Sequence, residues 1–246
     1  MNPQVSLVTG GAGEIGQSIV RSLLAKNHHV IINYKGASDE SSANSLIRSL
    51  TSNLAKRIKL LRADVSNPQE VTIMFEEAIH WKGQLHHLVN NAAIGVFKPV
   101  AEVTDEDILN IVSVNFYGTL YTCRAAATQL SEGGSIVNLS SSSTSQMLPG
   151  YGLYSATKGA VEQLSRVLAK ELGTKGINVN VVSPGPIDTE AFYRGKTDEF
   201  VDRLKQLSPH GRLGQPKEVG DLVAFLTSEE ASWINGQVIK VNGGAV

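Results

Sequence analysis

Short apolar runs rich in β-branched residues alternate along the chain with longer segments of helical periodicity. The runs lack the polar alternation of a strand with one face in water, which is typical of parallel strands buried on both faces. Strands spaced by helices indicate βαβ units. The sequence predicts seven strands, at Val5–Val8, Val30–Ile32, Ile58–Leu61, Leu85–Val89, Ile136–Leu139, Ile177–Val182 and Val238–Val241. It predicts helices at Ile15–Ala25, Pro68–Trp81, Asp105–Leu130, Tyr154–Gly173 and Pro216–Leu226.

These elements predict an α/β fold with a single doubly wound parallel sheet of about seven strands and helices on both faces, which is Rossmann-like. A chain of 246 residues fits one large domain or at most two small ones. No shift in composition suggests a linker, and no internal repeat divides the chain. We therefore expect one domain over residues 1–246.

Charge and composition exclude several classes of function. The 22 Lys and Arg nearly cancel the 23 Asp and Glu, so no overall field draws the chain to nucleic acid or to an anionic membrane. The run Val5–Val8 is too short for a signal-peptide core, and no apolar run approaches the ~18 residues of a membrane helix. The single cysteine, Cys123, cannot form an internal disulfide. We expect a soluble protein in the reducing cytoplasm.

The first predicted strand runs directly into a glycine-rich turn and then into a helix. Glycines let a pyrophosphate approach the backbone, and the helix amino terminus offers free N–H groups and a positive dipole end. This order favours a nucleotide site, and a glycine-rich turn without a ligand is the alternative. Glu14 suits the helix dipole but would repel a pyrophosphate unless it points outward. The turn reads Thr9-Gly10-Gly11-Ala12-Gly13-Glu14-Ile15-Gly16.

The end of the second predicted strand indicates which dinucleotide binds. An acid there holds the ribose hydroxyls of NAD, whereas a base holds the 2′-phosphate of NADP. The strand ends at Ile32-Asn33-Tyr34-Lys35, and no acid follows until Asp39. Lys35 therefore favours NADP(H) over NAD(H), with an ordinary exposed loop lysine as the alternative.

Three polar features could carry chemistry. Tyr154 and Lys158 stand four residues apart in a helical segment, so both leave the same helix face, although a surface pair has the same spacing. A serine run, 140–143, follows the strand Ile136–Leu139, where the carboxyl end of a parallel strand faces the ligand crevice. Asn115 lies on a largely apolar helix stripe, either as a functional amide or as a core residue at a helix kink.

Taken in order, these motifs resemble the short-chain dehydrogenase/reductase family over essentially the whole chain. Residues 211–216 and 233–238 resemble its carbonyl-reductase and 3-oxoacyl-reductase branch. Two positions depart from the family pattern, because Glu14 replaces the middle glycine of the first motif and Ala93 replaces the glycine that ends the Asn-Asn-Ala-Gly motif. The matching motifs are Thr9-Gly10 through Gly16, Asp64-Val65, Asn90-Asn91-Ala92-Ala93, Asn115, Ser141 with Tyr154, Lys158, and Pro184-Gly185 with Thr189.

The resemblance implies four catalytic residues. Tyr154 would donate a proton to the alkoxide that hydride transfer leaves on a carbonyl. Lys158 would stabilise the phenolate and bond the nicotinamide ribose. Ser141 would donate a hydrogen bond to the substrate oxygen, and Asn115 would hold a water joined to Lys158.

The resemblance also implies the residues that hold the dinucleotide. Asp64 and Val65 would flank the adenine, Asn91 would hold the adenine-side ribose, and Ile187 and Thr189 would engage the carboxamide. Taken alone, Asp64 reads as a turn residue and Thr189 as a helix cap. The expected cofactor-binding set is Gly10, Gly11, Glu14, Ile15, Gly16, Tyr34, Lys35, Asp64, Val65, Asn91, Ala92, Tyr154, Lys158, Pro184, Gly185, Ile187 and Thr189.

The segment around 186–210 is aromatic, without a clear strand or helix opening, and we expect it to form a substrate lid. Tyr151, Phe192 and Tyr193 would line the substrate site beside Ser141 and Tyr154. Aromatic lining suggests a moderately apolar carbonyl substrate, and no Arg cluster indicates a charged one. We expect no metal, since the pairs 28–29 and 86–87 are adjacent histidines, whose side chains point to opposite faces of a strand.

The resulting functional prediction is NADPH-dependent reduction of a small-molecule ketone or aldehyde by a homotetramer. A 3-oxoacyl-(acyl carrier protein) reductase is the first alternative. It would need basic surface for an acidic carrier, yet residues 125–157 contain no Lys or Arg, and only Lys175 offers some positive charge. A non-catalytic dinucleotide-binding redox sensor is the second alternative, but a sensor has no use for four catalytic residues.

Overall fold

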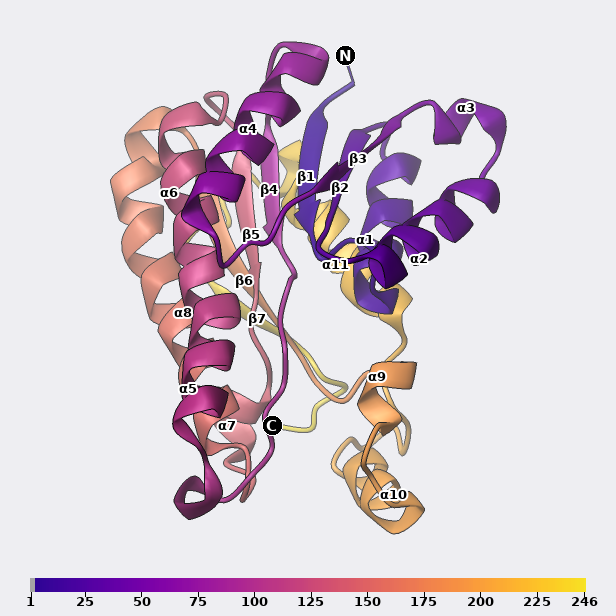
Figure 1. Cartoon of the computed structure of the whole chain (residues 1–246), viewed down its shortest axis with the longest axis vertical. Coiled ribbons are helices and arrows are strands. Elements are labelled where there is room, and N and C mark those ends of the chain that lie inside the picture. Colours follow the sequence, from indigo (N-terminus) through magenta and orange to yellow (C-terminus); the bar gives the residue numbers. More distant parts are fainter. Residues whose placement is uncertain (1–2) are drawn as a thin grey trace.

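The computed structural model describes residues 3–246, whose strands form one seven-stranded sheet in the order β3-β2-β1-β4-β5-β6-β7 (Figure 1). Every neighbouring pair of strands is parallel. The predicted doubly wound α/β sheet is confirmed. The strands are β1 (Val5–Thr9), β2 (His29–Tyr34), β3 (Ile58–Arg62), β4 (His87–Asn90), β5 (Ser135–Leu139), β6 (Asn178–Pro184) and β7 (Val238–Val241).

Helices cover both faces of this sheet. Those on one side in Figure 1 are α4, α5, α6 and α8, and those on the other are α1, α2 and α11, while α9 and α10 extend beyond the sheet edge. The helices are α1 (Glu14–Ala25), α2 (Ala37–Arg48), α3 (Ser52–Ala55), α4 (Pro68–Lys82), α5 (Asp105–Val112), α6 (Gly118–Gln129), α7 (Ser143–Gln146), α8 (Gly152–Leu172), α9 (Glu190–Tyr193), α10 (Asp198–Gln206) and α11 (Pro216–Leu226).

Two apolar cores lie on the two faces, and successive strand residues alternate between them. Val8 and Ile32 belong to the core under α1 and α11, whereas Leu7 and Ile31 belong to the core under α4, α6 and α8. All four side chains are fully buried. Burial on both faces explains why the strands read as uninterrupted apolar runs.

The helix predicted over Asp105–Leu130 is interrupted. A π-helical turn at Ser113–Tyr117 separates α5 from α6, and the buried Asn115 lies in that turn. Asn115 therefore lies at an irregular turn of the helix, as the alternative of a core residue at a helix kink predicted. Such turns inside a helix occur often at functional sites.

Five helices were not expected from the pattern, namely α2, α3, α7, α9 and α10. α3 and α7 have only four residues each. α2 has a polar sequence in which only Ala43 and Leu46 are buried, so its apolar periodicity is too weak to detect. α9 and α10 lie in the segment 186–210, for which the sequence predicts no clear strand or helix opening. Thr189 and Thr197 cap them, with each hydroxyl accepting a hydrogen bond from the backbone N–H three residues on. These threonines were a readable N-cap signal.

The strand order places a crevice where the chain reverses direction across the sheet. β2 and β3 lie on one side of β1, and β4 to β7 lie on the other. The connection that follows β1 and the connection that follows β4 therefore leave the sheet in opposite directions. Ligands of open α/β sheets bind in this crevice, outside the carboxyl ends of the strands. Within residues 3–246, no helix combines the length and apolar character needed to cross a membrane.

Buried histidines lie toward the opposite ends of the strands. The rings of His28 and His87 stack with centroids 5.2 Å apart. Each ring bonds a serine hydroxyl, His28 to Ser6 at 2.7 Å and His87 to Ser135 at 2.8 Å. Burial, with smaller effects of neighbouring charges, lowers the pKa of His28 to about 4 and lowers that of His87 well below its ordinary value.

We expect the free energy of unfolding to fall as pH drops from about 6.5 to about 4. The unfolded chain takes up protons at the ordinary histidine pKa, whereas buried His28 does not until about pH 4, so protonation favours unfolding across this window. His28 alone should contribute a loss of about 3 kcal/mol. Urea unfolding at several pH values should show a shallower pH slope in His28→Gln than in wild type, whereas exposed His80→Gln should keep the wild-type slope. Equal slopes in all three proteins would refute this assignment.

Candidate active site

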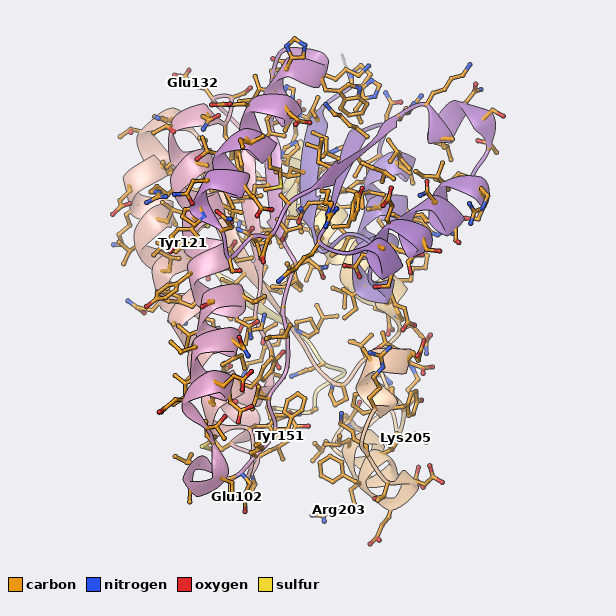
Figure 2. All side chains as sticks on the ribbon, in the orientation of Figure 1. Glu102, Tyr121, Glu132, Tyr151, Arg203 and Lys205 are labelled. Carbon is orange, nitrogen blue, oxygen red and sulfur yellow. The ribbon has the colours of Figure 1, made fainter. Side chains whose placement is uncertain are left out.

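A cavity of about 630 Å³ opens at the carboxyl ends of β1, β4, β5 and β6. Tyr151 lies at one side of its mouth, and α10, with Arg203 and Lys205, lies at the other (Figure 2). Most of the residues expected at the site line this cavity. They are Gly10, Glu14, Ile15, Gly16, Lys35, Asp64, Val65, Asn91, Ala92, Ser141, Tyr151, Tyr154, Lys158, Pro184, Gly185, Ile187, Thr189 and Phe192.

The glycine-rich turn is packed so closely that side chains are excluded. Gly10 has φ +58°, and a Cβ there would lie 2.8 Å from the Ala92 Cα. A Cβ on Gly16 would lie 2.4 Å from the Gly10 carbonyl oxygen. The Asn91 amide donates to the carbonyl oxygens of Thr9 and Gly10, at 3.1 and 2.9 Å, and fixes the turn against β4. The turn thus presents backbone and the start of α1 to the cavity, as an anion site requires.

Glu14, at the first position of α1, is turned toward α9. Its Oε1 accepts a hydrogen bond of 2.6 Å from the backbone N–H of Glu190, the first residue of α9. This contact joins residues 176 positions apart. The carboxylate that replaces the family glycine therefore has a partner outside the glycine turn.

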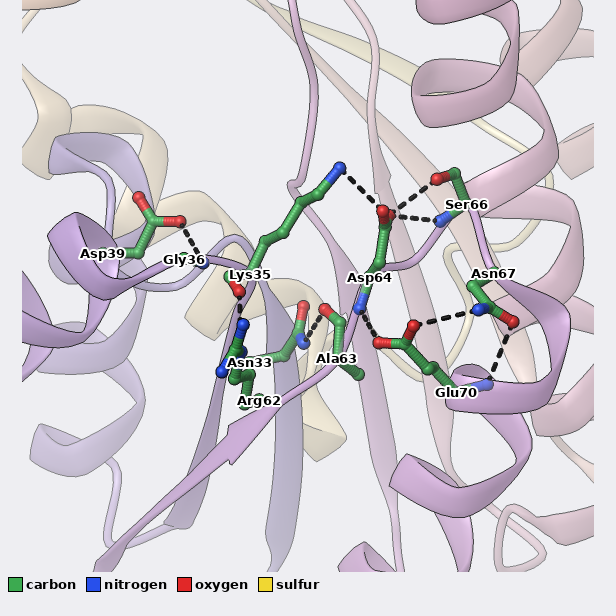
Figure 3. Close-up of polar contacts among 10 residues, drawn as sticks. All are labelled: Asn33, Lys35, Gly36, Asp39, Arg62, Ala63, Asp64, Ser66, Asn67 and Glu70. Atoms are coloured by element: carbon green, nitrogen blue, oxygen red, sulfur yellow. Dashed lines mark hydrogen bonds and ion pairs between the residues drawn. The ribbon is translucent and has the colours of Figure 1, made fainter.

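An ion pair occupies the end of the cavity next to β2 and β3 (Figure 3). Lys35 Nζ lies 2.6 Å from an Asp64 carboxylate oxygen. The other Asp64 oxygen accepts from the N–H and hydroxyl of Ser66, at 2.9 and 2.7 Å, so Asp64 is also the turn residue that its local sequence suggested. Burial alone would raise the pKa of Asp64, but hydrogen bonds from Lys35 and Ser66 hold it below the ordinary value.

Ser141, just after β5, and Tyr154 and Lys158, on α8, all line the cavity. Lys158 is 3% exposed, and its Nζ donates to the Leu139 carbonyl oxygen at 2.9 Å, while lying 5.8 Å from the centroid of the Tyr154 ring. Burial lowers the pKa of Lys158 to about 8. Burial also raises the pKa of Tyr154, and a hydrogen bond with Ser141 opposes this rise. The group combines a phenol, a hydroxyl and a buried cation.

Asn115 lies behind the cavity rather than in its wall. Its side-chain nitrogen donates to the Ile94 carbonyl oxygen at 2.9 Å and to the Thr157 hydroxyl at 3.2 Å, and its oxygen accepts from the Ile94 N–H at 2.8 Å. The amide thus ties the segment after β4 to α8, directly beside Lys158.

Three further expected residues do not line the cavity. Gly11 packs against Val8 and Ile32 in the core. Tyr34 is buried at the end of β2. Tyr193 is 43% exposed, and its hydroxyl donates to Asp188 at 2.9 Å. Tyr34 and Tyr193 neighbour cavity residues in sequence, but their side chains point elsewhere.

Among the cavity residues that were not expected from the sequence, Phe97 and Lys196 bear on the substrate side. The Phe97 ring packs on Tyr151 and Tyr154, with centroid distances of 4.5 and 5.4 Å. Lys196, between α9 and α10, also lines the cavity. The position of Phe97 in the loop after β4 was a usable signal, because the loops after parallel strands line the ligand crevice. Lys196 lies in a charged segment with no motif, so no pattern in the sequence indicated it.

Comparison with known proteins gives a consistent result. A family model described as Enoyl-(Acyl carrier protein) reductase matches residues 10–246. An Arabidopsis thaliana "NADPH-dependent aldehyde reductase-like protein, chloroplastic" is 39% identical, covering 99% of this chain and 94% of the relative. A Picea abies "Short-chain type dehydrogenase/reductase" is 38% identical, covering 99% and 92%.

A solved structure is similarly close. A blue fluorescent protein from a metagenomic library, in complex with NADPH, superposes with a TM-score of 0.92 at 32% identity, covering 100% of this chain and 98% of that one. Fold, motifs and relatives together define an oxidoreductase. This chain belongs to the short-chain dehydrogenase/reductase family.

Proposed function

We propose that this protein reduces an aldehyde or ketone with NADPH, and that Tyr154 donates the proton. The observation that carries the proposal is the meeting of Ser141, Tyr154 and Lys158 in one cavity with the glycine-rich turn. The names of the Arabidopsis relative and of the NADPH-bound structural neighbour support the cofactor.

The chemistry follows from the side chains. Bound NADPH supplies the hydride. Tyr154 protonates the carbonyl oxygen as it becomes an alkoxide, and Ser141 donates a hydrogen bond that orients this oxygen. With a pKa of about 8, Lys158 is mostly protonated at neutral pH, and its charge stabilises the phenolate. Asn115 bonds Thr157 and so positions α8 beside Lys158. We propose that it also holds a water through which protons reach Lys158 and Tyr154.

The cavity fits a dinucleotide at the positions proposed to bind it. The close packing at Gly10 and Gly16 excludes side chains, so the turn offers its backbone and the amino terminus of α1 to a pyrophosphate, and Glu14 is engaged by α9. Lys35 would hold the 2′-phosphate, and Asp64 with Val65 would flank the adenine. Because Lys35 is 66% exposed, it can exchange its Asp64 partner for a phosphate.

We also propose that residues 186–210 act as a substrate lid on one domain that spans 1–246. α9 and α10 stand apart from the sheet, and Glu14 links the start of α9 to the cofactor site. A segment tied to the phosphate end is well placed to close over substrate and cofactor together. Phe192 would line its inner side.

A carrier-bound substrate is the second candidate, because the matching family model is described as an acyl carrier protein reductase. Charge argues against it. The α9–α10 segment, 190–206, contains four acids and four bases, and two of its ion pairs are Arg194–Glu190 and Lys205–Asp202. A balanced lid gives an acidic carrier no net attraction. We therefore place a free aldehyde or ketone first.

A homotetramer remains our proposal for the assembly. Large apolar side chains are exposed on α5, on the π-turn and on α8, namely Leu109 at 67%, Tyr117 at 44% and Val167 at 47%, and Trp233 is 98% exposed before β7. Apolar surface of this kind marks interfaces. A cytoplasmic location also stays a prediction, since the Arabidopsis relative is named chloroplastic.

Tyr154→Phe should lower kcat for aldehyde reduction by about 10²–10⁴, because the proton donor is lost while the ring remains. NADPH absorbance with a panel of aldehydes and ketones measures this, and fluorescence titration should show unchanged NADPH affinity. Tyr121→Phe, on α6 outside the cavity, is the matched control and should keep full activity. Dinucleotide binding by wild type without turnover of any carbonyl would instead support the sensor.

Lys35→Met should raise the KM for NADPH about tenfold, which corresponds to ~1.4 kcal/mol, and leave the KM for NADH within twofold. The reason is loss of one charged contact to the 2′-phosphate. Exposed Lys56→Met controls for net charge. A wild-type enzyme that strongly prefers NADH would overturn the cofactor proposal.

Light scattering should give a mass four times the 26.3 kDa of one chain. Leu109→Asp should lower this mass, because burying a carboxylate in an apolar interface is unfavourable. Glu106→Asp, on the same helix, changes no charge and should leave the mass unchanged. A monomeric wild type would contradict the proposal.

A further inference from the structure

Lys196 is a cation in the cavity wall without an acidic partner. Within the described residues its Nζ forms no ion pair, and its hydrogen bond goes to the Phe192 carbonyl oxygen at 2.5 Å. Of the other cations in the segment, Arg194 pairs with Glu190 and Lys205 with Asp202, and Arg203 does not line the cavity. Lys196 therefore keeps its charge available to the cavity.

Aromatic rings hold this ammonium on the substrate side. Its Nζ lies 4.7 Å from the Phe192 ring centroid and 5.3 Å from the Phe97 centroid. Phe97 in turn packs on Tyr151 and Tyr154. A single aromatic ring, that of Phe97, thus lies between Lys196 and the proposed proton donor.

The acids of the cavity wall do not compete for Lys196. Glu14 accepts from the Glu190 N–H, Asp39 from the Gly36 N–H, and Asp64 pairs with Lys35. Partial burial lowers the pKa of Lys196, so its charged form gains from a counterion in this place. One end of the cavity, at the glycine-rich turn, would hold the cofactor. The other end, beyond Tyr151 and Tyr154, carries the positive charge of Lys196.

We propose that Lys196 recognises a carboxylate on the carbonyl substrate, separated from the carbonyl by a spacer about one aromatic ring long. This inference rests on the proposed function, since it places the carbonyl at Tyr154. It sharpens the expectation of a moderately apolar substrate: the spacer contacts Phe97 and Phe192, and the far end carries a negative charge. Lys196 is then a specificity-determining residue.

The experiment compares 4-carboxybenzaldehyde with its neutral analogue, methyl 4-formylbenzoate, at saturating NADPH. Lys196→Met should lower kcat/KM at least tenfold for the carboxylate, mainly through KM, and change it less than twofold for the ester. Lys196→Arg should retain most of the preference because it keeps the charge. Lys217→Met, which removes a cation on α11 that is already paired with Asp221 outside the lid, should leave both substrates unchanged.

Other outcomes overturn the inference. Equal losses on both aldehydes would mean that Lys196 only supports the lid, and a raised KM for NADPH would mean that it contacts a cofactor phosphate. Failure of the proposed function is distinguishable, because wild type would then reduce neither aldehyde. In that case calorimetry would measure the binding of 4-carboxybenzaldehyde, in the presence of NADP⁺, to wild type and to Lys196→Met. Tighter binding by wild type than by Lys196→Met supports the inference, and equal binding refutes it.

Discussion

The parallel pairing of every strand is the constraint on which the rest of this structure depends. Parallel strands bring all their carboxyl ends to one edge of the sheet, and burial on both faces leaves that edge as the place for a ligand. β1, β4, β5 and β6 deliver Gly10, Asn91, Ser141 and Pro184 to one cavity from four distant parts of the chain. The chemistry of the site follows from this geometry.

Backbone groups at this edge also hold the side chains of the proposed site in place. Asn91 bonds the carbonyl of Gly10, Lys158 that of Leu139, and Asn115 that of Ile94. Strand ends and the loops after them have carbonyl oxygens that no ladder partner uses, and buried donors satisfy them. The same bonds orient the amides and the ammonium, so stability and site geometry share one set of interactions.

The structure differs from the sequence-based predictions where the apolar periodicity of a segment is weak, or where a side chain binds a partner far away in the sequence. α2 buries only Ala43 and Leu46, so its polar sequence hid a helix. The π-turn interrupts a continuous helical pattern at Asn115, whose amide bonds Ile94, in a loop 21 residues earlier. Tyr34 and Tyr193 were expected at the site, but Tyr34 is buried at the end of β2, and Tyr193 is exposed and donates to Asp188.

By itself the sequence determined the strands, their burial on both faces, the glycine turn and the Tyr154–Lys158 spacing. These are local patterns, and each restricts the backbone conformation of only a few neighbouring residues. Only the tertiary structure decided where long side chains point: Glu14 to α9, Lys35 to Asp64, and Lys196 to the rings of Phe97 and Phe192. A flexible charged side chain finds its partner across the fold, and no spacing rule encodes that choice.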